Sequence, residues 1–327
     1  MTSAERPIRF GVFVPQGWRM DLTEIADPAE QYEAMARVAQ TAESAGFDSV
    51  WLYDHFHTIP EPTLESTFEC WSTTAALARD TRRVKIGQMV TCFGYRYPSV
   101  LAKMASTVDA LSHGRLIVGL GAGWYADEWH AYGLRFPETR ERMAMFREAC
   151  EVIHHMWSED QPTFEGRYYR LNRPINRPRA IQSPHPPLWI GGGGEQVTLR
   201  LVARWGDACN IGGTPEQIRH KLDVLRQHCA DLGRDFQSIV RSTAVEEVYL
   251  VARESEVGPT RDRVTRGMPA ALATGLMIGT PAAIAAHLQD RVEAGVDYFV
   301  VYLRRAAYEP DQVEWFGREV VPLVHPS

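Results

Sequence analysis

Eight short apolar segments alternate with eight longer segments of helical periodicity, and this alternation is the feature that most constrains the fold of the chain. Most of the short segments are apolar throughout, which indicates strands buried on both faces of a parallel sheet. We therefore predict an α/β protein with a (β/α)8 TIM barrel rather than an open doubly wound sheet. The predicted strands are Ile8–Val14, Asp48–Tyr53, Val84–Val90, Leu116–Leu120, Leu188–Ile190, Asp207–Ile211, Ser242–Val251 and Val296–Tyr302.

The helical segments lie between these strands, and several have clear boundary signals such as Gly46 after the first helix. Residues 158–187 and 253–270 interrupt the alternation, and Thr163–Tyr169 has the pattern of a small hairpin. We expect both segments to be insertions over the C-terminal face of one domain that spans 1–327. The predicted helices are Pro28–Ala45, Phe68–Arg79, Pro98–Leu111, Pro137–Trp157, Glu195–Trp205, Pro215–Leu232, Thr280–Ala294 and Asp311–Val321.

Composition excludes several classes of protein. The chain has 45% hydrophobic and 23% charged residues, which is ordinary for a globular protein. A net charge of −6 without a basic run disfavours nucleic-acid binding, and no apolar run reaches the roughly 18 residues of a membrane span. The N-terminus has no signal-peptide pattern, and the five cysteines have no CxxC spacing, so we expect a cytoplasmic protein with reduced thiols.

Active sites of such barrels lie at the C-terminal ends of the strands, so the residues after each strand are the candidates. The loops there are rich in aromatic residues, glycine and histidine and contain few charges, which is typical of a wide pocket for a planar ring. The side chains that we expect to line a substrate pocket are Trp18, His57, Tyr95, Trp124 and Tyr125.

Four consecutive glycines, Gly191–Gly194, connect a predicted strand to a predicted helix that starts at Glu195. Glycines let the backbone approach a ligand, and a helix N-terminus offers free N–H groups, so this loop predicts a phosphate site. Gly212-Gly213 repeats the arrangement, with Thr214 as a helix cap. Tight turns that serve packing alone are the alternative for both loops. We interpret Gly119–Gly123 as backbone that leaves space for a ring, rather than as a dinucleotide-binding fingerprint.

Asp54-His55 follows the second predicted strand and is the candidate for proton transfer. Histidine titrates near neutral pH, and the neighbouring carboxylate can fix its tautomer or bind a ligand. A helix-capping Asp and a structural His are the alternative. Asp54, His55, His57 and Glu61 or Glu65 could supply metal ligands, but their spacing fits no recognised pattern, so we expect no metal.

Other catalytic classes lack suitable residues. The chain has three lysines, of which Lys85 starts a strand and Lys103 and Lys221 lie within helices, so Schiff-base chemistry is disfavoured. No GxSxG elbow is present. Cys92 we interpret as pocket lining.

These features together resemble the bacterial luciferase-like family of flavin and deazaflavin oxidoreductases, over nearly the whole chain. The resemblance rests on IRFGVFVPQG, AESAGFDSVWLYDHF, the segment from RVKIGQMV to EWHAYG, and PPLWIGGGGEQVTLRLVARWGDACNIGG. It implies a barrel with insertions over its mouth, a homodimer, and a flavin-type ring across the strand ends. It also implies a non-prolyl cis peptide near Val90-Thr91-Cys92, behind the ring.

The resemblance implies cofactor contacts after five successive strands. These residues are Asp54, Val90, Thr91, Cys92, Gly121, Ala122, Gly123, Gly192, Gly193, Gly194, Glu195, Gly212 and Gly213. Asp54-His55-Phe56 matches the DHF tract of the branch that uses the deazaflavin coenzyme F420, in which the His is proposed to exchange a proton beside the hydride carbon. The resemblance therefore implies an F420-dependent oxidoreductase with His55 and Asp54 as catalytic residues.

Two alternatives share this scaffold: an FMN-dependent monooxygenase that works with a separate flavin reductase, and a non-catalytic flavin-binding protein. An F420 reductase is a further possible partner. Within the F420 branch, glucose-6-phosphate dehydrogenases carry a Glu where Trp124 stands and a lysine near Gly213-Thr214. These departures argue against a sugar phosphate and favour a small apolar or aromatic substrate.

Overall fold

The computed structural model describes residues 6–325, except for the side chain of Glu246. The described residues form two compact units. The first comprises 6–68, 211–220 and 241–325, and the second comprises 69–210 and 221–240. Each unit has its own run of parallel strands.

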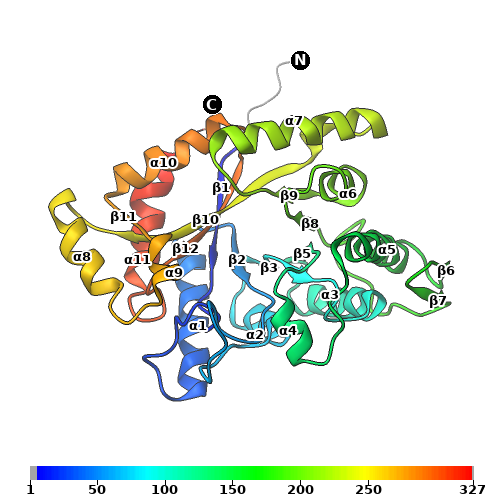
Figure 1. The fold of residues 1–327 in the computed structure, drawn as a ribbon, viewed down its shortest axis with the longest axis horizontal. Helices are drawn as coiled ribbons and strands as arrows, with labels where there is room; N and C mark the ends of the chain where they lie inside the picture. The colour runs from blue at the N-terminus through cyan, green and yellow to red at the C-terminus, as the bar shows by residue number, and fades with distance from the viewer. Residues whose placement is uncertain (1–5, 326–327) are drawn as a thin grey trace. The chain divides into compact units, whose positions relative to one another are not determined.

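Five parallel strands of the first unit pair in the order β11-β10-β12-β1-β2 (Figure 1). Gly11 in β1 lies opposite Val300 on one side and Ser49 on the other. Every residue of β2 and β12 is buried, as expected for strands covered on both faces. The strands are β1 (Arg9–Phe13), β2 (Ser49–Leu52), β10 (Val240–Leu250), β11 (Met277–Gly279) and β12 (Tyr298–Leu303).

Helices of the first unit begin and end at the signals that the sequence carries. The Asp27 carboxylate caps α1 by accepting hydrogen bonds from the N–H groups of Ala29 (2.7 Å) and Glu30 (3.2 Å), and Gly46 follows the helix with φ of +85°. The helices are α1 (Pro28–Ser44), α8 (Val257–Val264), α9 (Ala270–Thr274), α10 (Pro281–Glu293) and α11 (Asp311–Trp315), with a 3-10 turn at Glu254–Glu256, a π-helical turn at Phe316–Val320 and a 3-10 turn at Val321–Leu323.

In the second unit the parallel strands pair in the order β3-β5-β8-β9, and β4 also pairs with β5. The non-prolyl peptide bond between Met89 and Val90 is cis and lies between β3 and β4. The resemblance predicted such a bond near Val90-Thr91-Cys92, and the structure confirms it. The strands are β3 (Lys85–Gln88), β4 (Thr91–Cys92), β5 (Leu116–Gly121), β8 (Leu188–Gly191) and β9 (Ala208–Asn210).

Helices α3 and α5 pack against each other in the second unit, and a two-stranded antiparallel hairpin follows α5 (Figure 1). The hairpin consists of β6 (Thr163–Glu165) and β7 (Arg170–Asn172), as the sequence predicted for this insertion. The remaining elements are α2 (Cys70–Asp80), α3 (Pro98–Leu111), α4 (Ala126–Ala131), α5 (Thr139–Ser158), α6 (Thr198–Trp205), α7 (Pro215–Leu232), which begins in the first unit, and a 3-10 turn at Phe236–Ser238.

The order of strands and helices confirms the predicted (β/α)8 barrel. Three details differ. Helix α6 starts at Thr198 rather than at Glu195, because Glu195–Val197 form a turn. Helices α4, α8 and α9 and strand β11 were not predicted, since α4, α9 and β11 span only six, five and three residues and the polar 253–270 segment lacks an apolar period. The last predicted helix is α-helical only as far as Trp315.

None of the helices within residues 6–325 combines the length and the apolar character needed to cross a bilayer. All five cysteines are buried and none forms a disulfide. Burial raises the pKa of the Cys150 thiol, which keeps this cysteine protonated and unreactive.

Candidate functional site

The candidate acid–base residue, His55, stacks on Trp18 in the first unit. The two rings are parallel, with centroids 4.2 Å apart and 4° between their planes. Trp18 is buried, and its ring also contacts Tyr53 at 4.3 Å. Asp54 is only 2% exposed, whereas His55 is half-buried. The stack covers one face of the imidazole and holds its plane.

A buried charge network lies next to this stack. Glu247 in β10 forms ion pairs with Arg19 (2.6 Å) and Arg304 (3.6 Å), and all three side chains are largely buried. The Tyr302 hydroxyl donates a hydrogen bond to Asp21, and burial, reinforced by the charge of Asp21, raises the pKa of Tyr302. No local sequence pattern indicates this network, because its members lie up to 285 positions apart in the chain.

The second glycine loop, Gly212-Gly213, has a structural explanation of its own. The Thr214 hydroxyl caps α7 by accepting from the Gln217 N–H (3.3 Å), and the Gln217 amide oxygen accepts from the Thr214 N–H (3.0 Å). This is a capping box, as the prediction of Thr214 as a cap implied. Gly213 has φ of +130°, and an added Cβ would lie 2.6 Å from the Gln217 side-chain oxygen. Helix entry therefore accounts for the glycine, and the phosphate role stays a prediction.

In the second unit, two glycines of β5 and the glycine that ends β8 make room for the segment around Val90. An added Cβ at Gly191 would lie 2.8 Å from a Val90 methyl carbon, and one at Gly121 would also clash with Val90. At Gly119 an added Cβ would collide with the Gln88 carbonyl oxygen. The sequence analysis interpreted Gly119–Gly123 as clearance for a ring. The clearance at Gly119 and Gly121 is occupied by the protein's own segment around the cis peptide.

Thr91 and Cys92, which follow this cis peptide, are both buried. The Trp71 indole N–H donates to the Thr91 hydroxyl (3.1 Å), and a Cβ at Gly123 would lie 2.6 Å from the Cys92 sulfur. Gly123 has φ of +71°, which favours glycine on conformational grounds as well. The structure therefore brings Val90–Cys92 together with Gly121 and Gly123, five of the residues expected to contact a cofactor.

The first glycine loop lies against a lysine that the sequence analysis assigned no role. A Cβ added at Gly193 would clash with the Lys221 side chain, which reaches the loop from α7. Lys221 is half-buried, and its ammonium forms no hydrogen bond or ion pair with the residues that the structure describes. Lys221 lies 28 positions after Gly193 in the sequence, so no local pattern indicated that the two residues are neighbours.

The loop itself is held at both ends. The Gly192 N–H donates to the Asn210 carbonyl (3.0 Å), and the Gly194 carbonyl accepts from the Leu199 N–H (3.0 Å). The N–H groups of Gly193 and Gly194 donate to no acceptor within residues 6–325. Two free N–H groups beside a half-buried ammonium form an arrangement suited to a phosphate.

The aromatic side chains expected in a substrate pocket have different environments. The Tyr95 hydroxyl donates to the buried Glu128 in α4 (2.6 Å), so this tyrosine has a structural partner. Trp124 is 62% exposed and stacks on Tyr125, with centroids 5.1 Å apart. His57 is half-buried. Trp18 stacks on His55. Their contacts with a substrate stay a prediction.

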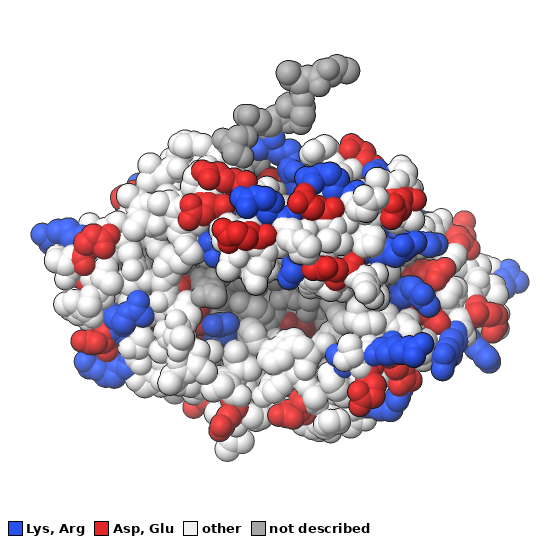
Figure 2. Space-filling view, turned by 45° about the horizontal axis from the view of Figure 1, so that its top comes forward, with Lys and Arg blue, Asp and Glu red and all other residues white. Residues whose placement is uncertain are grey.

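Lys and Arg side chains are interspersed with Asp and Glu on the face drawn in Figure 2, and they form no continuous basic stripe there. Among the described residues, His, Cys, Asp and Glu side chains form no group of three placed to hold a metal ion.

A sequence profile of the family described as luciferase-like monooxygenase matches residues 8–256, which is more than half of the chain. The chain belongs to this family. A relative in Kineococcus radiotolerans, named F420-dependent glucose-6-phosphate dehydrogenase, is 32% identical over 91% of this chain and 95% of its own length.

Solved structures of similar fold support the assignment to the luciferase-like fold. An F420-dependent secondary alcohol dehydrogenase in complex with an F420-acetone adduct superposes with a TM-score of 0.78 and 21% identity, over 98% of this chain and 99% of that one. An EDTA monooxygenase from Chelativorans sp. gives a TM-score of 0.79 and 19% identity, over 97% and 93%. At these identities the likeness shows the fold alone.

Proposed function

We propose that this member of the luciferase-like family is an F420-dependent oxidoreductase that passes hydride between the cofactor and a small organic substrate. The observation that carries the proposal is His55, half-buried and held in a fixed plane on Trp18 directly after β2. The name of the Kineococcus relative, an F420-dependent dehydrogenase, supports the choice of cofactor.

Bound F420 would supply the ring carbon that accepts or gives up the hydride. In alcohol oxidation the substrate carbon loses a hydride, and the hydroxyl proton passes to a ring nitrogen of His55. In reduction of a carbonyl, an imine or a conjugated alkene, His55 returns the proton. Asp54 holds the imidazole or the cofactor in position. This division of roles explains why a buried carboxylate precedes a less buried histidine.

The remaining cofactor contacts come from backbone-rich segments. Val90–Cys92 and Gly121–Gly123 would lie against the ring, and Gly192–Glu195 would hold the phosphate with Lys221 as its cationic partner. Gly212-Gly213 would add backbone contacts. The unpartnered Lys221 ammonium supports the phosphate assignment, since a half-buried cation is stabilised by an anion.

For the substrate we propose a small apolar or aromatic molecule. Trp124 stands where the sugar-phosphate dehydrogenases carry a Glu. It stacks on Tyr125, and the two side chains together present an aromatic surface. A sugar phosphate is the second candidate, because the Kineococcus relative is named for glucose 6-phosphate.

An FMN-dependent monooxygenase with a separate flavin reductase is the alternative for the cofactor, favoured by the family description and by the EDTA monooxygenase structure. A non-catalytic flavin-binding protein would keep the fold and leave His55 dispensable. A homodimer, a reductase that supplies reduced cofactor and a cytoplasmic location complete the proposal.

Activity measurements distinguish these candidates. Purified protein with oxidised F420 is mixed with glucose 6-phosphate or with a panel of secondary and aromatic alcohols, and loss of the oxidised cofactor's absorbance is followed. We expect turnover with an apolar alcohol and its loss in His55→Asn. Turnover with glucose 6-phosphate alone would replace the substrate class. No turnover of any F420 form, with oxygen-dependent turnover of reduced FMN, would overturn the proposed cofactor.

A further inference from the structure

A β-bulge in β10 places a glutamate in the interior of the first unit. Val245 pairs with Val301 of β12, and Glu247 pairs with the next residue, Tyr302, so β10 has one extra residue at this point. Bulges redirect side chains and are frequent beside active sites. Glu247 therefore takes the register position that residue 246 would have in an unbroken strand, and it is only 1% exposed.

Glu247 contacts two arginines that follow neighbouring strands. Its Oε1 accepts a hydrogen bond from Arg19 Nε at 2.6 Å, and its Oε2 lies 3.6 Å from Arg304 Nη1. Arg19 follows β1 and Arg304 directly follows β12, and the strands β10, β12 and β1 are adjacent in the sheet. The three side chains therefore meet at the carboxyl ends of these strands, where barrel enzymes bind their substrates.

Arg19 connects this group to the candidate acid–base residue. Its guanidinium carbon lies 5.7 Å from the centroid of the Trp18 ring, and Trp18 stacks on His55. The Arg19 side chain is 22% exposed, so a small ligand can reach it, whereas the side chains of Arg304 and Glu247 are almost fully buried. An arginine in this place attracts an anionic substrate unless a carboxylate cancels its charge.

Two carboxylates cancel the charge of the two arginines. Asp21, which is 4% exposed, accepts a hydrogen bond from the Tyr302 hydroxyl. All four charged groups act on this buried tyrosine, so they form one electrostatic network. Asp21 and Glu247 together balance Arg19 and Arg304. An anion brought against Arg19 must compete with Glu247 for the guanidinium and must also lose its own water.

We propose that Glu247 determines the charge of the substrate, because it neutralises the arginines beside His55 and thereby selects an uncharged substrate over a phosphorylated or carboxylated one. This inference rests on the proposed function and assigns the substrate class of that site. It separates the two substrate candidates, since an apolar alcohol needs no free cation, whereas a sugar phosphate does. Removal of the negative charge of Glu247 should therefore allow anions to bind.

Two aromatic ligands of similar shape and different charge, benzamide and benzoate, provide the test. Their binding is measured by equilibrium dialysis of the radiolabelled ligands with F420 in excess, so no turnover is needed. Wild-type protein should bind benzamide at least about tenfold more tightly than benzoate, because the carboxylate loses water without gaining a free partner.

Glu247→Gln keeps a hydrogen-bond acceptor for Arg19 and removes the charge. This variant should bind benzoate about 10- to 100-fold more tightly than the wild-type protein does, the range expected for a charge-assisted hydrogen bond. Its affinity for benzamide should stay the same. Arg19→Gln/Glu247→Gln should lose the gain, because the guanidinium that the benzoate carboxylate would contact is gone.

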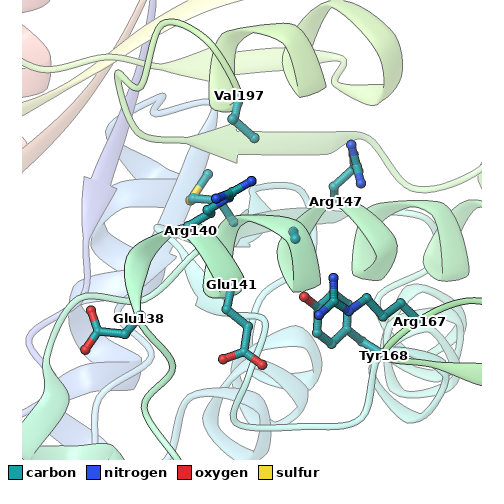
Figure 3. Close-up of a pocket in the computed structure, with 9 residues that line it drawn as sticks. Glu138, Arg140, Glu141, Arg147, Arg167, Tyr168 and Val197 are labelled. Carbon is teal, nitrogen blue, oxygen red and sulfur yellow. The ribbon is translucent and has the colours of Figure 1, made fainter.

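A matched control separates this local effect from one of net charge. Glu141 lines a surface groove of the second unit beside the start of α5 (Figure 3), and Arg135 binds both of its oxygens, at 3.0 and 2.7 Å. Glu141→Gln makes the same change in net charge and also removes a carboxylate from an arginine. It should bind benzoate no more tightly than the wild-type protein.

Thermal unfolding shows whether the variants keep the fold, since Glu247→Gln leaves buried arginines without their carboxylate. If Glu247→Gln is unfolded under the conditions of the assay, Asp21→Asn replaces it. This substitution removes the other carboxylate of the network and should give a smaller gain in benzoate affinity.

Benzoate affinity that is unchanged in the folded variant would overturn the proposal, as would an equal gain in Glu141→Gln. Wild-type protein that binds benzoate as tightly as benzamide would also overturn it, since the site would then accept anions. Failure of every variant to bind either ligand would show that this site takes no such substrate and would overturn the proposal as well. Absence of F420-dependent turnover would overturn the proposed function and leave the binding result unaffected.

Discussion

The Trp18 indole and the His55 imidazole lie face to face, with ring centroids 4.2 Å apart and only 4° between their planes. Trp18 comes from the segment after β1 and His55 from the segment after β2, so two neighbouring strand ends of the first unit set the orientation of the histidine. A histidine held in this way loses little entropy when it exchanges a proton with a substrate.

Replacing His55 with Asn should lower the single-turnover rate of hydride transfer about 100-fold or more, because positioned acid–base groups contribute about 10²–10⁴-fold. Affinity for F420 should change much less. Rapid mixing separates the two quantities. His113→Asn is the control, since His113 is an exposed histidine that contacts Arg79 outside the candidate site. A rate that is unchanged in His55→Asn would remove the proton-transfer role.

Trp18→Phe should lower the same rate by a smaller factor, about 3- to 10-fold, because a smaller ring still stacks but fixes the imidazole less well. The loss should appear in kcat rather than in KM for the substrate. A change confined to KM would show that Trp18 contacts the substrate instead of acting through His55.

Lys221→Gln should weaken binding of phosphate-bearing F420 about 10- to 100-fold, as expected for a charge-assisted hydrogen bond worth about 1.5–3 kcal/mol. Binding of the deazaflavin without phosphate should stay the same. Lys103→Gln is the matched control, since Lys103 donates to the Arg177 carbonyl oxygen. Equal losses for both ligands in Lys221→Gln would contradict a phosphate contact.

Gly193→Asp should also weaken binding of phosphate-bearing F420, because the new carboxylate would meet Lys221 and repel the phosphate. The loss should be reduced when Lys221 is already replaced by Gln, as a double-mutant cycle would show. Affinity in Gly193→Asp equal to that of the wild-type protein would remove the loop from the phosphate site.

Gly121→Ala should destabilise the fold by about 1–3 kcal/mol, since the added methyl group clashes with Val90. Val90→Ala in the same chain should recover part of this loss by making room. Denaturant unfolding of the two single variants and the double variant measures both effects. Strictly additive losses would show that Gly121 and Val90 do not constrain each other.

The environment of Glu69 predicts that the free energy of unfolding depends on pH. Burial opposes its ionisation, but hydrogen bonds from Ser72 and Trp71 and the charge of Arg96 outweigh burial and hold the pKa of Glu69 below its ordinary value. The ionised carboxylate caps α2. Its stabilisation is therefore present above the unfolded pKa of about 4.3 and is lost as pH falls through the lower folded pKa.

Glu69→Ala should cost about 1 kcal/mol at pH 7, the usual value of a helix cap. The difference between wild type and variant in free energy of unfolding should shrink below about pH 4. A difference that persists unchanged to lower pH would show that Glu69 stabilises α2 by packing rather than by charge.

The barrel could be predicted because eight short apolar runs alternate with eight helical segments, a pattern that the sequence carries locally. Thr214 could be predicted as a helix cap because the capping signal lies within four residues. The cis peptide came from the resemblance, since nothing in the composition of Met89-Val90 indicates it.

The features that escaped prediction depend on contacts between distant segments. Lys221 looked like an ordinary helix residue until the fold brought it against Gly193. The glycines of β5 suggested space for a ligand, but Val90 occupies part of that space.

The most direct measurement is a fluorescence titration of the purified protein with F420 and, separately, with FMN. The account predicts saturable binding of F420 that is at least about tenfold tighter than binding of FMN, equivalent to about 1.4 kcal/mol. Tighter binding of FMN, or binding of neither cofactor, would contradict the assignment of the protein as an F420-dependent oxidoreductase.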